Sequence, residues 1–158
     1  EASVQRFQPT QLAGDNTTTS PAGAAAAVAS EPVVLPAGFD AEGFMRQAKM
    51  HFIRLQASFD AANLNDLREF TSPEMFAELQ LEIHERKGAA NKTEVIDIQA
   101  AVAEVVEEAG RYIVSVRFTG SVREDDATMP EAVDEIWHMT KPISGAGGWV
   151  VAGIQQSF

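Results

Sequence analysis

The chain has 158 residues, a formal charge of -11 at pH 7 and no cysteine. This length is enough for one domain with a substantial core. The lack of cysteine excludes disulfides, thiol catalysis and cysteine-based zinc sites, and the acidic balance argues against nucleic-acid binding, which needs a basic footprint. No run of about 18 apolar residues occurs, so we expect no membrane-spanning helix within this sequence.

Residues 1–36 are predicted to form a disordered linker, and residues 37–158 a folded domain. Ala, Thr, Ser, Pro and Gly dominate the first segment, so it can bury too little apolar surface to offset the entropy of ordering. The sequence begins with Glu1 rather than Met. We therefore expect it to be a fragment or a processed chain, and a signal or membrane segment can precede it.

The first predicted element of the domain is a long amphipathic helix over residues 39–62. Asp40 is its expected N-cap. One helical face carries an apolar stripe with three phenylalanines, formed by Phe44, Ala48, Phe52, Leu55, Phe59 and Ala62. Such a stripe is unstable in water, so the helix needs a sheet or a groove to cover it.

The opposite side of this helix is basic, although the chain as a whole is acidic. It carries cations and apolar residues together: Arg46, Lys49, Met50, Ile53 and Arg54. We take this surface as the candidate for contact with a membrane or a protein partner. The simpler alternative is that the cations keep an exposed helix face soluble, with their aliphatic stems lying along it.

The rest of the chain predicts two further helical segments and then a sheet. A short turn at residues 66–70 precedes a helix that starts at Pro73, is capped by Ser72 and ends at Gly88. Alternating patterns then predict four strands near residues 96–106, 112–122, 133–143 and 149–156.

The first strand should place Ile96, Ile98, Ala100 and Val102 on one face, with a bulge near residues 104–106. Because short turns join successive strands, the sheet should be an antiparallel meander. We therefore expect an α+β fold in which N-terminal helices pack on one face of a curved four-stranded antiparallel sheet.

The ordered series of motifs resembles one known family. The residues that carry the resemblance are Phe39-Asp40, Arg46-Gln47-Ala48, Asp66-Leu67-Arg68-Glu69-Phe70-Thr71, Asp134-Glu135, Trp137-His138 and the ending Gly148-Trp149-Val150-Val151-Ala152-Gly153-Ile154-Gln155-Gln156. Over residues 39–156 the chain resembles the C-terminal domain of the membrane-anchoring subunit of the mitochondrial import motor, the Tim44-like family, together with its bacterial relatives.

This resemblance implies a cone of helices and sheet, similar to nuclear-transport-factor-two and cystatin-like folds, with an apolar pocket between the two layers. We expect the pocket to be lined by Phe52, Phe59, Tyr112, Val116, Phe118 and Trp137. The resemblance also implies binding to anionic phospholipid membranes and to a protein partner, without catalysis or a cofactor. An upstream segment would anchor the domain, as in bacterial relatives at the inner membrane.

A rival hypothesis is a small-molecule-binding or catalytic cone that uses a pocket near Trp137, His138 and Trp149. A docking domain can have a dry apolar pocket, whereas an enzyme needs two or three ionisable groups that converge inside one. Asp134 and Glu135 are adjacent on a strand, so they should face opposite sides of the sheet and cannot act as a catalytic pair.

Overall fold

The computed structural model describes residues 33–86, 92–125, 127–145 and 147–156. Most of the predicted linker and Gly88, the expected helix end, lie outside these residues. Three helices come first: α1 (Ala41–Asp60), α2 (Leu64–Phe70) and α3 (Pro73–Glu85). Four strands follow: β1 (Thr93–Glu108), β2 (Arg111–Glu124), β3 (Glu131–Pro142) and β4 (Val150–Gln156).

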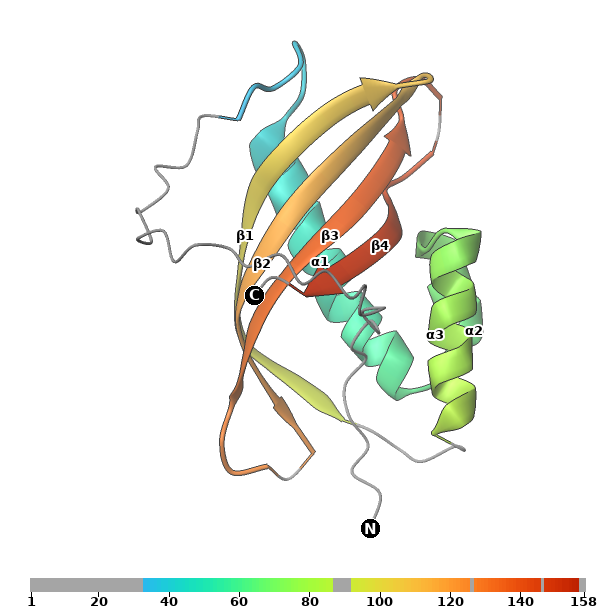
Figure 1. The fold of residues 1–158 in the computed structure, drawn as a ribbon, viewed down its shortest axis with the longest axis vertical. Coiled ribbons are helices and arrows are strands. Elements are labelled where there is room, and N and C mark those ends of the chain that lie inside the picture. The colour runs from blue at the N-terminus through green and yellow to red at the C-terminus, as the bar shows by residue number, and fades with distance from the viewer. Residues whose placement is uncertain (1–32, 87–91, 126, 146, 157–158) are drawn as a thin grey trace, which may run out of the picture.

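The strands form one antiparallel sheet in the order β1-β2-β3-β4. The sheet is curved, α1 runs diagonally behind it, and α2 and α3 lie together beyond β4 (Figure 1). We call the face that carries α1 the inner face and the opposite one the outer face. The predicted α+β class and the antiparallel meander are therefore confirmed.

The start of α1 follows the predicted capping pattern. The side chain of Asp40 accepts a hydrogen bond from the backbone N–H of Gly43 at 3.0 Å. Phe39, just before the cap, packs on Phe44 with ring centroids 5.8 Å apart, which is a hydrophobic staple. A Cβ at Gly43 would lie 2.3 Å from Oδ2 of Asp40, so a larger residue at position 43 would force the capping carboxylate to move.

The core lies between α1 and the inner face of the sheet. The rings of Phe52, Phe118 and Trp137 contact one another, with centroid separations of 5.0 to 5.2 Å. All three side chains are fully buried. Phe52 of α1 therefore packs directly against Phe118 of β2 and Trp137 of β3.

The C-terminal end of α1 is capped by the side chain of Arg86, which directly follows α3. Nη2 of Arg86 donates to the carbonyl oxygens of Phe59 and Asp60 at 2.7 and 3.0 Å. The last carbonyl groups of a helix have no partner within the helix, so Arg86 satisfies two of them. It also lies over the Phe59 ring, 4.9 Å from its centroid.

Strand β1 departs from the predicted alternation in two places. Its register against β2 shifts between Val102 and Glu104, close to the predicted bulge, and also between Val95 and Asp97. The second shift makes Ile96 an extra residue that is 45% exposed. The prediction that Ile96 shares the buried face with Ile98 is therefore wrong, because Val95 takes the inner position.

Candidate functional site

The exposed side of α1 carries the predicted contact surface. Arg46, Lys49, Met50 and Ile53 follow the spacing of one helical face, and we call these four residues the α1 stripe. Met50 is 68% exposed and Ile53 is 49% exposed. Neither Arg46 nor Lys49 forms an ion pair with another residue in the part of the chain that the structure describes.

Arg54, the third predicted cation, has a different role. Its Nε donates to both carboxylate oxygens of Asp66 at 3.2 and 3.1 Å, and its Nη2 bonds the same carboxylate and Oε2 of Glu69. The guanidinium also lies over the Phe70 ring, 4.4 Å from its centroid. Arg54 therefore joins α1 to α2, and Asp66 and Glu69 together offset its charge.

The electrostatics of this junction follow from the same contacts. Hydrogen bonds from Arg54 and then from Ser58 lower the pKa of Asp66 below its ordinary value of 3.8. The hydrogen bond to Asp66 likewise raises the pKa of Arg54. Asp66 therefore stays ionised at neutral pH. Of the three predicted cations, Arg46 and Lys49 remain without an ion pair among the described residues.

The six residues expected to line an apolar pocket are placed in two different environments. Tyr112 lines a pocket at the N-terminal end of α1. The others are at most 2% exposed and pack within the core: Phe52, Phe59, Val116, Phe118 and Trp137. The space between α1 and the sheet is occupied there by their own rings and branched side chains.

The pocket at the start of α1 has a volume of about 230 Å³ and aromatic walls. Trp149 is central to it, with ring centroids 4.7 Å from Phe44 and 6.4 Å from Tyr112. The Nζ of Lys141 lies 5.9 Å from the centroid of the Trp149 ring. Neither Phe44 nor Lys141 was predicted to line a pocket. The staple between Phe39 and Phe44 was the signal that could have located one end of it.

The arrangement around His138 contradicts the site expected by the rival hypothesis. His138 lies on the outer face, where its Nδ1 is 3.0 Å from Oγ of Ser115 and its Nε2 is 2.8 Å from Oε1 of Gln155. Trp137 is fully buried on the inner face. Because successive residues of a strand point to opposite faces, Trp137 and His138 do not line one pocket.

The two acidic neighbours on β3 also face opposite sides, as predicted. Asp134 on the outer face is bound by Arg117, with N–O distances of 2.9 and 2.7 Å. Glu135 is 1% exposed and accepts a hydrogen bond from Nε1 of Trp137 at 3.0 Å. They therefore make separate structural contacts and do not form a catalytic pair.

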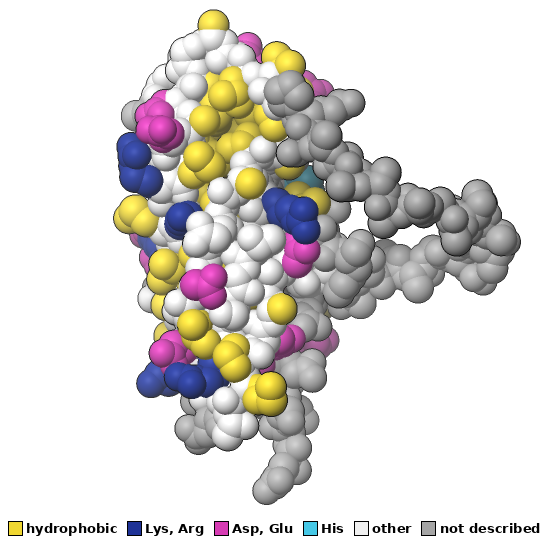
Figure 2. Space-filling model, turned by 90° about the vertical axis from the view of Figure 1, so that its left-hand side faces the viewer, with side chains coloured by type: hydrophobic (Ala, Val, Ile, Leu, Met, Phe, Trp, Pro, Cys, Tyr) yellow, Lys and Arg dark blue, Asp and Glu magenta, His cyan; other side chains and the backbone are white. Residues whose placement is uncertain are grey.

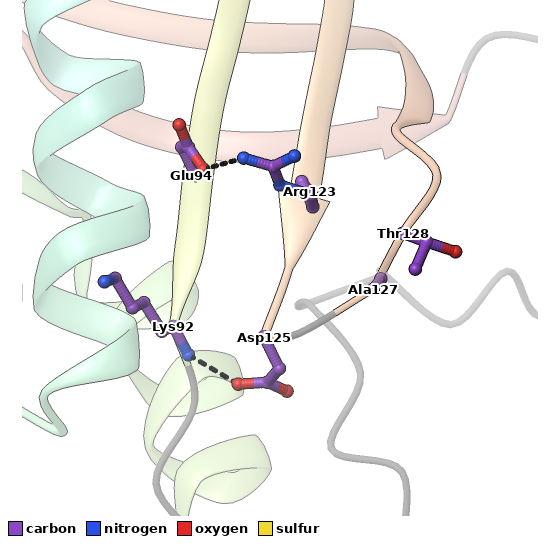
Figure 3. Close-up of a pocket in the computed structure, with 6 residues that line it drawn as sticks. All are labelled: Lys92, Glu94, Arg123, Asp125, Ala127 and Thr128. Carbon is purple, nitrogen blue, oxygen red and sulfur yellow. Dashed lines mark hydrogen bonds and ion pairs between the residues drawn. The ribbon is translucent and has the colours of Figure 1, made fainter.

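A polar cleft of about 520 Å³ lies where β1 begins and β2 ends (Figure 3). Arg123 is bound to Glu94 at 2.6 Å, and the backbone N–H of Lys92 donates to Asp125 at 3.1 Å. Two cationic and two anionic side chains balance, so the cleft offers no net charge to a ligand. We interpret it as a clamp between the two strand ends.

Among the described residues, no group of three histidine or acidic side chains could hold a metal ion. The helices of the same residues are too short or too polar to cross a bilayer. The candidate site is therefore the α1 stripe, with the aromatic pocket beside the start of the same helix.

A comparison with protein families matches residues 25–156 to the Tim44-like domain. A search of curated proteins found no match to the chain. The family match spans most of the sequence, so the chain belongs to the Tim44-like family, whose domains are membrane-associated and related to protein import.

Proposed function

We propose that this domain binds the surface of anionic membranes through the α1 stripe. We also propose that it docks a protein partner at the membrane surface. The observation that carries this proposal is the exposure of Met50 and Ile53 beside two cations without an ion-pair partner among the described residues. Figure 2, which faces the side where α1 and β1 lie, shows hydrophobic side chains gathered near separate basic groups. Exposed apolar groups of this kind are typical of interaction sites.

The expected affinity for the membrane is low. Each basic side chain near an anionic bilayer contributes about 1 kcal/mol, and salt screens the effect. Arg46 and Lys49 supply two such contacts, while shallow insertion of Met50 and Ile53 adds an apolar term. The acidic remainder of the chain, with its net charge of -11, opposes binding.

Stable attachment therefore requires a second signal, as it does for proteins that carry a single lipid chain. We propose that an anchor upstream of the linker supplies it, and that the membrane is a bacterial inner membrane. The α1 stripe would then orient a domain that the anchor already keeps near the bilayer.

Co-sedimentation with anionic and neutral vesicles, at low and physiological salt, tests this proposal. We expect wild type to prefer anionic vesicles at low salt, and Arg46→Glu/Lys49→Glu to lose most of that binding. Arg68→Glu/Arg111→Glu is the matched control because it makes the same charge change at exposed positions elsewhere. Equal binding of wild type to neutral vesicles, or equal losses in the two variants, would exclude a specific α1 surface.

The aromatic pocket supports a second candidate, binding of a small apolar molecule. Its lining contains four aromatic side chains and one ammonium group, from Phe39, Phe44, Tyr112, Trp149 and Lys141. The chain has two tryptophans, so Trp137→Phe leaves Trp149 as the reporter of this pocket. A saturable change in Trp149 fluorescence with a small aromatic probe would support the candidate, and its absence would remove it.

A further inference from the structure

The two edges of the sheet are not alike. On the β4 edge, the backbone N–H of Ser72 donates to the carbonyl oxygen of Val151 at 2.9 Å, and Thr71 forms a parallel bridge to the same residue. No strand within the described ranges pairs with the outer edge of β1, the longest strand at 16 residues. An edge strand directs part of its backbone N–H and C=O groups away from the sheet, where another chain can bind them.

The charge of β1 is one-sided. The strand carries five acidic residues and no lysine or arginine. Two of the acids have partners, because Arg123 binds Glu94 and Ser121 donates to Asp97 at 2.6 Å. Glu104 and Glu108 lie on the outer face of the strand and form no ion pair within the described part of the chain. The C-terminal half of the edge therefore carries negative charge that an incoming cation can neutralise.

The same half of β1 has apolar side chains that the domain leaves incompletely covered. Val106 is 38% exposed on the outer face, whereas Val102 and Val105 lie half-buried at the margin of the core on the inner face. From Glu104 onward the strand keeps a regular register with β2. An added strand could therefore continue both the backbone ladder and the apolar row.

We propose that the β1 edge docks an extended basic peptide segment of a partner protein as a fifth strand. Main-chain hydrogen bonds would supply affinity, as in other cases of β-strand addition. Alternate side chains would bring lysine or arginine to Glu104 and Glu108 on the outer face and apolar groups to Val102 and Val105 on the inner face. This inference rests on the partner docking proposed above, and it places the partner on a different surface from the α1 stripe.

A second copy of this chain does not fit the same edge. Antiparallel pairing of two β1 strands would bring two sets of five acids together, and like charges on facing strands are destabilising. Bulges and charged side chains are common means of preventing such self-pairing. The same acidic side chains that disfavour pairing with a second copy favour the binding of a basic segment.

The probe is a short peptide of alternating valine and lysine, capped at both ends and titrated against the full chain. We expect it to bind more weakly at high salt and to slow hydrogen exchange at the backbone amides of β1. Glu104→Lys/Glu108→Lys should weaken binding about tenfold, because it converts two attractive contacts on the outer face into repulsive ones. Glu78→Lys/Glu85→Lys, on the exposed side of α3, is the control with the same charge change and should retain the wild-type affinity.

Three results would overturn the proposal. A peptide of alternating valine and glutamate that binds equally well would remove the charge argument. A lysine peptide with prolines at the valine positions that binds equally well would remove the strand pairing, because proline cannot donate to a ladder. Protection from exchange outside β1 would move the site. Arg46→Glu/Lys49→Glu should still bind the peptide, so loss of membrane binding and loss of partner docking are distinguishable.

Discussion

The guanidinium of Arg54 on α1 donates hydrogen bonds from Nε and Nη2 to the carboxylate of Asp66 on α2. This pair changes how the basic side of α1 must be interpreted. The sequence presents three cations at helical spacing, whereas the structure uses one of them to fix the angle between two helices. The α1 stripe consequently ends at Ile53, and its charge comes from Arg46 and Lys49.

Replacement of Arg54 should separate stability from membrane binding. Arg54→Met keeps much of the side-chain length but removes the ion pair, so it should lower the free energy of unfolding by about 1 kcal/mol, the upper range for an exposed pair. Vesicle binding should change little. Chemical denaturation and co-sedimentation check the two effects, and Arg46→Met is the control expected to show the opposite pattern.

The Arg54–Asp66 pair also predicts a pH dependence. Because the folded-state pKa of Asp66 lies below its ordinary value of 3.8, the ionised form stabilises the fold at pH values above that point. This contribution should be lost as the pH falls through the lower folded-state pKa. Denaturation of wild type and Arg54→Met across this acidic range should therefore give stability curves that converge at the lowest pH. A constant separation between the curves would contradict the assignment.

For Glu82 on α3 we predict the opposite pH dependence, namely a contribution to stability that falls as the pH rises. Burial, followed by the nearby charges of Glu85 and Glu78, raises its pKa above 4.5. The folded state therefore favours the protonated form, and stability from this group falls as the pH rises from 4.5 through the folded-state pKa. Glu82→Gln should be slightly more stable than wild type at neutral pH, whereas Glu108→Gln at the exposed hairpin should not. A destabilised Glu82→Gln would show that its carboxylate makes a favourable contact.

Truncation of a core residue should lower the free energy of unfolding much more than the loss of a surface ion pair. Phe52 is fully buried between Phe118 and Trp137, so Phe52→Ala should lower the free energy of unfolding by about 3–5 kcal/mol. The neighbouring change Ile53→Ala removes a side chain that is 49% exposed and should cost less than about 1 kcal/mol. Urea denaturation compares them, and similar losses at both positions would contradict the assignment of helix faces.

The fold could largely be predicted because its signals are local and repeated. The phenylalanine spacing locates α1 independently of the other elements. The capping residues Asp40 and Ser72 likewise mark the starts of α1 and α3. Alternation in β2 was equally clear, since Val114, Val116, Phe118 and Val122 are all fully buried. The order of elements then left few alternatives to an antiparallel meander.

The candidate site could be predicted less well because it depends on contacts between elements. Nothing near Arg54 in the sequence shows that it forms an ion pair with Asp66, twelve residues later. The bulge at Ile96 shifts the strand by one residue, and β1 itself contains no glycine or proline to mark it. His138 alternates with Trp137, so its outward direction was implicit in the strand pattern, but the rival hypothesis assigned both residues to one pocket.

Because the chain has no cysteine, a single label can test whether Met50 meets the bilayer. Met50→Cys would carry an environment-sensitive dye, with Met129→Cys as the control at a similarly exposed loop position, 77% against 68% exposed. On addition of anionic vesicles at low salt, we expect a blue shift in the emission of the Met50 label and none from the Met129 label. Equal shifts at both positions, or no shift at Met50 while the protein co-sediments with the vesicles, would contradict membrane contact through α1.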